Sequence, residues 1–161
     1  MIVLGFDPGY ANLGISVVDT EAKEVLEGIC MRSGVKTAPW KFSRNVVPVL
    51  ERLRDLHGVE AIGMERPPKF PNAVATTALV WLTMGIIAGW AFHHKLPVKD
   101  ISVDKHKAGV RTILGLPKTK KKPTKSQVKE AVEIYTGAKS NFVDHVDDAT
   151  MAAILCYPLK R

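Results

Sequence analysis

Two acidic residues stand where an apolar run of the sequence ends. Asp7 follows the apolar run 2–6, and Glu65 follows the mostly apolar run 59–64, which indicates a buried strand. Either acid alone is compatible with an ordinary turn, because Asp before Pro-Gly is common in turns. If the two runs are neighbouring parallel strands, however, both carboxylates emerge at the carboxyl-terminal edge of the sheet, where α/β proteins place ligands. Two adjacent carboxylates repel each other, so a divalent cation is the simplest way to keep both ionised.

A third acidic group lies near the C-terminus, in the segment 144–148, Asp-His-Val-Asp-Asp. It opens an expected helix over about 143–155 whose later residues are small and apolar. His145 and Asp148 are three residues apart, and Asp144 and Asp148 are four apart, so either pair shares a helical face. Acids at a helix N-terminus are favoured by the helix dipole. Three acids and a histidine within five residues exceed what capping requires.

Together these residues predict a metal site made of Asp7, Glu65 and Asp148, completed by His145 or by Asp144. Such a set suits Mg²⁺ or Mn²⁺, which are hard cations with mostly oxygen ligands and open positions for water and phosphate. Two ions of this kind activate an attacking water and stabilise the leaving 3′ oxygen in phosphodiester hydrolysis.

The excess positive charge of the chain lies in one stretch. The formal net charge is +7, and residues 99–125 hold nine Lys or Arg and two Asp, which leaves the rest of the chain neutral. A lone charge run is usually a solvated face, but a stripe of this length favours a phosphate backbone as its partner, because binding releases condensed counterions. The basic residues expected to contact DNA are Lys105, Lys107, Arg111, Lys118, Lys120, Lys121, Lys122 and Lys125.

The elements that must position these residues follow from the apolar pattern. Strands expected over 2–6, 13–18 and 23–30 are typical of an antiparallel meander. Helical spacing then predicts a helix over 42–56, in which Pro48 introduces a kink or marks the first turn. Further strands are expected over 59–64 and 98–103, and further helices from about 72, over 105–114, over 124–135 and over 143–155. This order predicts an α/β fold: a mixed five-stranded sheet, three antiparallel strands followed by two parallel ones, flanked by helices.

Length and composition set the remaining expectations. The 161 residues suit a single domain spanning 1–161, and no signal peptide is expected at the start of the chain. Cys30 and Cys156 lack the spacing of a zinc site and are expected to be reduced thiols of a cytoplasmic protein. The segment Ala73 to Phe92 carries no charge, and a helix buried on all sides, against the sheet or a second subunit, explains it better than a membrane span.

The ordered set of motifs resembles the RuvC-type Holliday junction resolvases over nearly the whole chain. Phe6-Asp7-Pro8-Gly9 is similar to the opening motif of that family, and Met64-Glu65 to its second acid. Lys125-Ser126-Gln127-Val128 is similar to a motif of its basic region, and His145 with Asp148-Ala149 to its final ligand pair.

The resemblance implies an RNase H-like fold and a homodimer that makes paired nicks across a four-way DNA junction. It implies two Mg²⁺ ions per active site, for which Mn²⁺ can substitute, and no small-molecule cofactor. The catalytic metal ligands would be Asp7, Glu65, His145 and Asp148. Lys107 and Lys125 match family positions that contact DNA.

One departure from the family concerns the aromatic residue that inserts at the junction. Here Phe70 follows Glu65 only after Pro67-Pro68, and is either a base-stacking wedge or an ordinary packed loop residue. Three other functions stay open at this point. One is a broader branched-DNA or flap endonuclease, and another is a non-catalytic DNA-binding module on the same fold. The third is an actin-like phosphotransferase or ATPase, suggested by the spacing from Asp7 to Gly14, although 161 residues supply only one of its two lobes.

Overall fold

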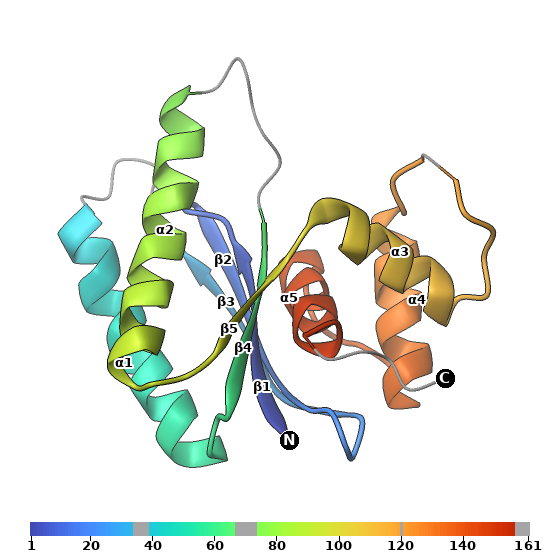
Figure 1. Ribbon diagram of the computed structural model, residues 1–161, viewed down its shortest axis with the longest axis horizontal. Helices are drawn as coiled ribbons and strands as arrows, with labels where there is room; N and C mark the ends of the chain where they lie inside the picture. The colour runs from blue at the N-terminus through green and yellow to red at the C-terminus, as the bar shows by residue number, and fades with distance from the viewer. Residues whose placement is uncertain (34–38, 67–73, 120, 157–161) are drawn as a thin grey trace.

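The computed structural model describes residues 1–33, 39–66, 74–119 and 121–156, and has a five-stranded mixed sheet at its centre (Figure 1). The strands, in chain order, are β1 (Ile2–Pro8), β2 (Asn12–Asp19), β3 (Glu24–Arg32), β4 (Ala61–Glu65) and β5 (Val98–Ile101). They lie in the order β3-β2-β1-β4-β5; β1 to β3 pair antiparallel, and β4 and β5 continue parallel to β1. The mixed sheet predicted from the sequence is confirmed.

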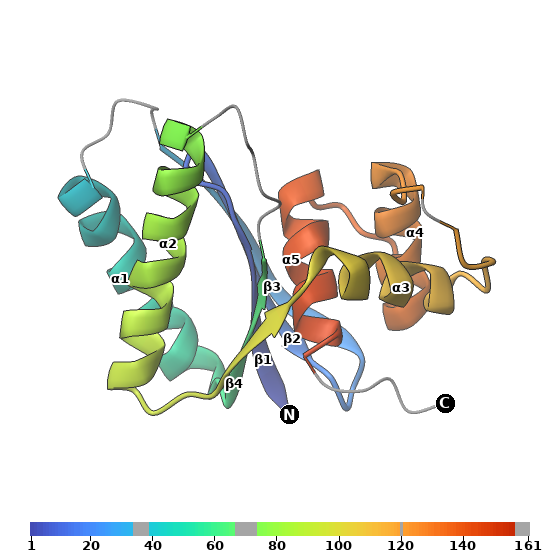
Figure 2. The same ribbon diagram turned by 45° about the horizontal axis from the view of Figure 1, so that its top comes forward.

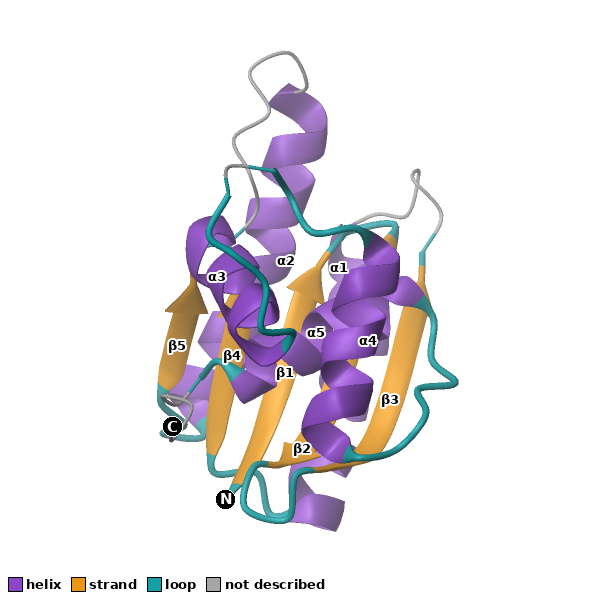
Figure 3. Cartoon of the chain, turned by 90° about the vertical axis from the view of Figure 1, so that its right-hand side faces the viewer, coloured by secondary structure: helices purple, strands orange, loops and turns teal. Residues whose placement is uncertain are grey.

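Helices cover both faces of the sheet, in one layer on one side and two on the other (Figures 1 and 2). One face carries α1 (Pro39–His57) and α2 (Val74–His93). The other face carries α5 (Asp144–Ile154), which packs against β1, β2 and β4. Outside α5 lie α3 (Val103–Ile113) and α4 (Lys125–Thr136), as the view onto that side shows (Figure 3).

The alternation of side chains along β1 divides the interior into two cores. Leu4 and Phe6 belong to the core beneath α1 and α2, whereas Val3 belongs to the core formed with α5. Successive residues of a strand point to opposite faces, so Gly5 and Asp7 share the α5 side with Val3. The acid therefore leaves the strand on the side where α5 packs.

Helix α5 approaches the sheet unusually closely, because the strands present glycine beneath it. A Cβ atom on Gly5 would overlap the backbone carbonyl of Ala149, and one on Gly63 would overlap that of Ala152. A Cβ atom on Gly14 would likewise overlap the backbone of His145. The absence of side chains at these three strand positions thus lets the helix backbone rest directly on the sheet.

Several element boundaries differ from those expected. The strand predicted over 98–103 ends at Ile101, because the hydroxyl of Ser102 accepts a hydrogen bond from the backbone N–H of Lys105 (3.2 Å) and caps α3. Helix α3 therefore begins at Val103, earlier than predicted. The β4 strand begins at Ala61, and α1 begins at Pro39, so that Pro48 lies well inside the helix and not in its first turn.

Helix α2 is buried on one side only within this chain. Ile87 and Ala91 are buried, whereas Trp81 and Phe92 are exposed. Residues Ala75–His93 are long and apolar enough to cross a bilayer by length and composition, but core helices pass the same test, and 28% of the window is buried here. The expectation of burial on all sides is thus met on the sheet side alone, and covering of the other side by a second subunit stays a prediction.

Candidate active site

The register of the parallel strands places Asp7 and Glu65 side by side. Phe6 pairs with Met64 in β1 and β4, so the next residue of each strand is one of the two acids. Gly5 pairs with Gly63 in the same register, and both glycines face α5, as do the acids two residues further on. The expectation that two strand-end acids meet at the carboxyl-terminal edge is confirmed.

Helix α5 brings a histidine and a third acid to this edge. The Nδ1 atom of His145 lies 2.6 Å from Oδ2 of Asp7, and this hydrogen bond raises the pKa of His145 above its usual value. Asp148 is one helical turn further on, and burial, reinforced by the charge of Asp7, raises its pKa to about 6. Because the α5 backbone rests on glycines of the sheet at His145 and at Ala149, the helix segment that carries both side chains lies directly against the strands.

Glu65 is the most strongly perturbed acid of the cluster. Burial, followed by repulsion from Asp7 and Asp148, raises its pKa to about 8, although Lys122 acts in the opposite direction. Within the described residues, then, the neighbours of the cluster do not compensate the negative charge that its acids carry when all are ionised. A site with this electrostatic character is suited to a bound cation.

A further histidine, His106 of α3, joins the cluster and was missed in the sequence. Its Nε2 atom lies 3.7 Å from Oδ1 of Asp148, and Glu65, His106 and Asp148 each offer a ligand atom within 4.8 Å of the others. Burial, followed by the charge of Lys122, lowers the pKa of His106 to about 4. The imidazole is therefore neutral near pH 7, and its contact with Asp148 is not an ion pair.

A signal for His106 was present in the helical spacing of α3. The buried residues of this helix are His106, Gly109 and Val110, which lie three and four positions apart on one face. In the sequence, His106 stands within the charged stretch, where it separates Lys105 from Lys107. Its position on the apolar face, rather than among the lysines, indicates that it points inward.

The other two acids of the 144–148 segment point elsewhere. Asp144 forms an ion pair with Lys125 (2.6 Å) at the rim and is half exposed. Asp147 is buried on another side of α5, where it accepts a hydrogen bond from the hydroxyl of Ser140 (2.6 Å). The structure thus brings His145 and Asp148, and not Asp144, to the strand-end acids.

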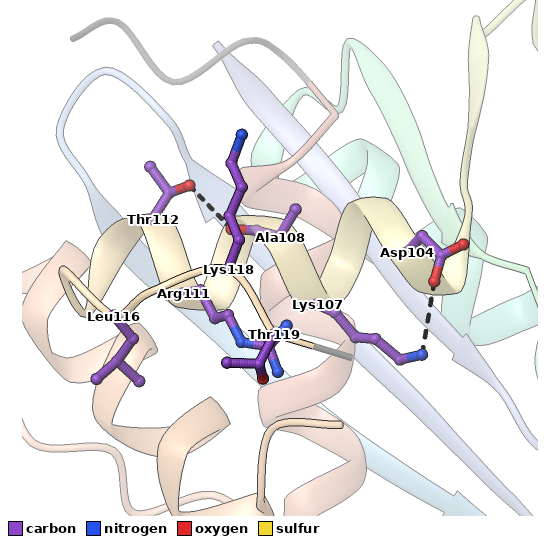
Figure 4. A pocket seen from close by; sticks show the side chains of 8 residues that line it. All are labelled: Asp104, Lys107, Ala108, Arg111, Thr112, Leu116, Lys118 and Thr119. Carbon is purple, nitrogen blue, oxygen red and sulfur yellow. Dashed lines mark hydrogen bonds and ion pairs between the residues drawn. The ribbon is translucent and has the colours of Figure 1, made fainter. Parts of the chain in front are cut away.

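The predicted DNA-binding residues divide into groups. Lys107, Arg111 and Lys118 line a pocket of about 440 Å³ on the outer side of α3 (Figure 4), where Lys107 also contacts Asp104. The positive charge of Lys122 lowers the pKa values of Glu65 and Asp148 in the acid cluster. Lys125 lies at the rim of this cluster, where it forms the ion pair with Asp144.

The remaining basic residues either do not line the pocket or lie outside the described residues. Burial and the nearby charge of Lys99 lower the pKa of Lys105, which lies toward Cys156 and away from the pocket. The backbone carbonyl of Lys121 accepts a hydrogen bond from the Arg111 guanidinium. Lys120 and Phe70 lie outside the described residues.

Solved structures with a similar fold include three whose similarity extends over nearly the whole of this chain. RuvC of Thermus thermophilus in complex with a Holliday junction substrate has a TM-score of 0.78 and 20% identity, covering 96% of this chain and 92% of that one. Another T. thermophilus RuvC structure has a TM-score of 0.77 at 24% identity, with the same coverage. The yeast mitochondrial Holliday junction resolvase Ydc2 has a TM-score of 0.63 at 15% identity, covering 96% of this chain and 77% of that one.

No family model and no curated protein matches the sequence. The similarity to the solved structures shows that this chain has the RNase H-like fold of RuvC. The RNase H-like fold that the sequence resemblance implies is confirmed.

Proposed function

We propose that this protein is a divalent-metal-dependent endonuclease that resolves four-way DNA junctions by paired phosphodiester hydrolysis. The observation that carries the proposal is the convergence of Asp7, Glu65, His145 and Asp148 at one sheet edge. The fold that holds them is shared with RuvC and with a mitochondrial Holliday junction resolvase. The basic residues beside the site supply the contact with a phosphate backbone that such an enzyme needs.

The donor set fits a hard divalent cation. Glu65, with a pKa of about 8, holds a proton near pH 7 that a bound cation would displace, and the raised pKa of Asp148, about 6, likewise reflects an acid whose charge a cation would stabilise. Asp7, beside Glu65 in the strand register, offers further carboxylate oxygens, the ligands that Mg²⁺ prefers. We infer two Mg²⁺ ions, replaceable by Mn²⁺; when bound they acidify water and offset the charge of the leaving oxygen.

His145 is suited to moving a proton at the edge of this cluster. If Nδ1 donates its hydrogen to Asp7, the second ring nitrogen, Nε2, carries a lone pair that accepts a proton from water. The side chain is 39% exposed, so a phosphodiester can reach it. Asp7 therefore fixes the orientation and tautomer of the ring that we propose as ligand or base.

The basic pocket on α3 and the rim lysines define a path for the DNA backbone. Lys107, Arg111 and Lys118 gather on one side of α3, and Lys122 and Lys125 lie near the acids on the other. A DNA backbone that crosses α3 from the pocket to the acid cluster would contact both groups of basic residues in turn. We propose a homodimer as the active form, with the exposed apolar side of α2, including Trp81 and Phe92, as the surface that the second copy covers.

The decisive experiment compares a labelled immobile four-way junction with a matched linear duplex, each with Mg²⁺, Mn²⁺ or EDTA. We expect symmetric paired nicks in the junction alone, lost with EDTA and in Asp7→Asn. Asp55→Asn, which removes an exposed carboxylate of α1, is the matched control and is expected to cut normally. Equal cutting of flap and fork competitors would widen the function to branched DNA, whereas junction binding without cleavage under any metal would contradict catalysis.

A further inference from the structure

The ring of His106 is buried without satisfying its hydrogen-bonding capacity. Its side chain is only 4% exposed, and its Nε2 atom has no hydrogen-bond partner among the described residues. An unpartnered buried nitrogen costs free energy, because water no longer solvates it. A histidine kept in this state for packing alone would carry that cost without compensation.

The atoms that face Nε2 are the carboxylates of the acid cluster. The distance from Nε2 to Oδ1 of Asp148, 3.7 Å, is too long for a hydrogen bond. It matches two ligands of one cation, because ligand atoms about 2.1 Å from an octahedral ion are separated by about 3.0–4.2 Å. Glu65 completes a group of three donor atoms that lie within 4.8 Å of one another.

Packing of α3 against α5 holds this arrangement in place. A Cβ atom on Gly109 would overlap the side chain of Leu155, so the two helices approach closely one turn beyond His106. The N-cap of α3, formed by Ser102 directly after β5, fixes the other end. His106 is therefore directed at the cluster from a third element, in addition to the strands and α5.

We propose that His106 binds the divalent metal through Nε2, so that the site has a mixed nitrogen and oxygen donor set that favours Mn²⁺ over Mg²⁺. The proposal rests on the proposed function, since it takes the acid cluster to hold a metal. Imidazole is a borderline ligand that transition-metal ions accept more readily than Mg²⁺ does, whereas carboxylates suit both. Loss of His106 should therefore weaken Mn²⁺ binding much more than Mg²⁺ binding.

The test measures the metal directly and does not require cleavage. Mn²⁺ is titrated into the full-length protein and followed by electron paramagnetic resonance, and electron spin echo modulation then detects ¹⁴N nuclei coordinated to it. Mg²⁺ affinity is obtained by competition. The variants are His106→Gln, His145→Gln for the second histidine of the site, and His93→Gln as a control at the exposed end of α2.

In His106→Gln we expect Mn²⁺ affinity to fall about tenfold or more, the size of effect that loss of even an outer-shell partner produces. Mg²⁺ affinity should change less, and the ¹⁴N modulation should decrease while persisting in His145→Gln and His93→Gln. Unchanged modulation in folded His106→Gln, with Mn²⁺ bound, would overturn this inference and leave the proposed function intact. If no Mn²⁺ binds the wild type, with or without junction DNA, the proposed function itself fails.

Should His106→Gln not fold, the wild-type protein still decides the question. Selective ¹⁵N labelling of histidine allows the ring nitrogens to be observed by NMR while Zn²⁺, a diamagnetic probe, is added. A large shift of the buried His106 Nε2 resonance on Zn²⁺ addition supports coordination. A shift confined to other histidines contradicts it.

Discussion

The two faces of the sheet are built from the same strands but packed on different principles. Beneath α1 and α2, large side chains such as Leu4, Phe6 and Ile62 fill the space between sheet and helices. Beneath α5, Gly5 and Gly63 remove the side chains, and the helix backbone rests on the strands. The first face supplies buried apolar area, which dominates stability. The second fixes the position of α5, because main-chain contacts determine where the site residues of this helix, His145 and Asp148, lie.

The largest effect is expected from adding a side chain beneath α5. Gly5→Val should destabilise the fold by about 3 kcal/mol or more and abolish cleavage, because its Cβ overlaps the backbone of Ala149, which cannot rotate away. Leu4→Val, one residue away on the opposite face, should cost about 1 kcal/mol and preserve cleavage. Urea denaturation and junction cleavage measure both. Equal stability losses with equal cleavage would contradict the division of roles between the faces.

Removing a strand-end acid should separate activity from stability. Asp7→Asn should lower the cleavage rate at least about 10²-fold, comparable to the loss of one charge-stabilising group in an active site. In the metal-free protein it should change stability little, because relief of the repulsion by which Asp7 raises the pKa values of Glu65 and Asp148 offsets the weaker hydrogen bond to His145. Single-turnover cleavage and metal-free thermal unfolding test the two halves. A variant that is both inactive and strongly destabilised would indicate a structural role for Asp7.

The acids and the fold were predictable because their signals are local. An apolar run predicts a buried strand, and an acid directly after it is visible whatever the rest of the chain does, as for Asp7 and Glu65. The choice between His145 and Asp144 was not predictable, because it depends on the rotation of α5 about its axis, which the distant glycines of the sheet determine. His106 was overlooked for a related reason: its neighbours in sequence are lysines, whereas its neighbours in space are acids.

The α5 face should also make the metal-free protein sensitive to pH. Glu65 has a folded pKa of about 8 against an ordinary value of 4.5, so between these values the folded state binds the extra proton and stability falls as pH rises. From pH 6.5 to 8 the loss is expected to be about 1–2 kcal/mol. His106, with its lowered pKa, has the opposite sign but acts only below about pH 6.5, and the raised pKa of His145 adds to the loss.

Glu65→Gln isolates the contribution of that acid to the pH dependence. The variant lacks the titrating group, so its metal-free stability should decline less between pH 6.5 and 8 than that of the wild type. Saturating Mn²⁺ should flatten the wild-type profile in the same way, because the bound cation keeps the carboxylate ionised. Denaturant unfolding at several pH values provides the measurement. Parallel profiles for variant and wild type would show that Glu65 is ionised in the metal-free fold.

The smallest effect is expected at the basic surface of α3, where a substitution removes a charge and leaves the packing against the sheet unchanged. Lys118→Gln, in the pocket on α3, should weaken DNA binding only a few-fold and equally for junction and duplex. The slope of log affinity against log salt should fall by about 0.9, the value for one lost phosphate contact. Arg52→Gln, on the α1 face and paired with Glu27, should leave the slope unchanged. A junction-specific loss in Lys118→Gln would instead assign that residue to recognition of branched structure, because a contact to phosphate alone carries no preference between the two DNA forms.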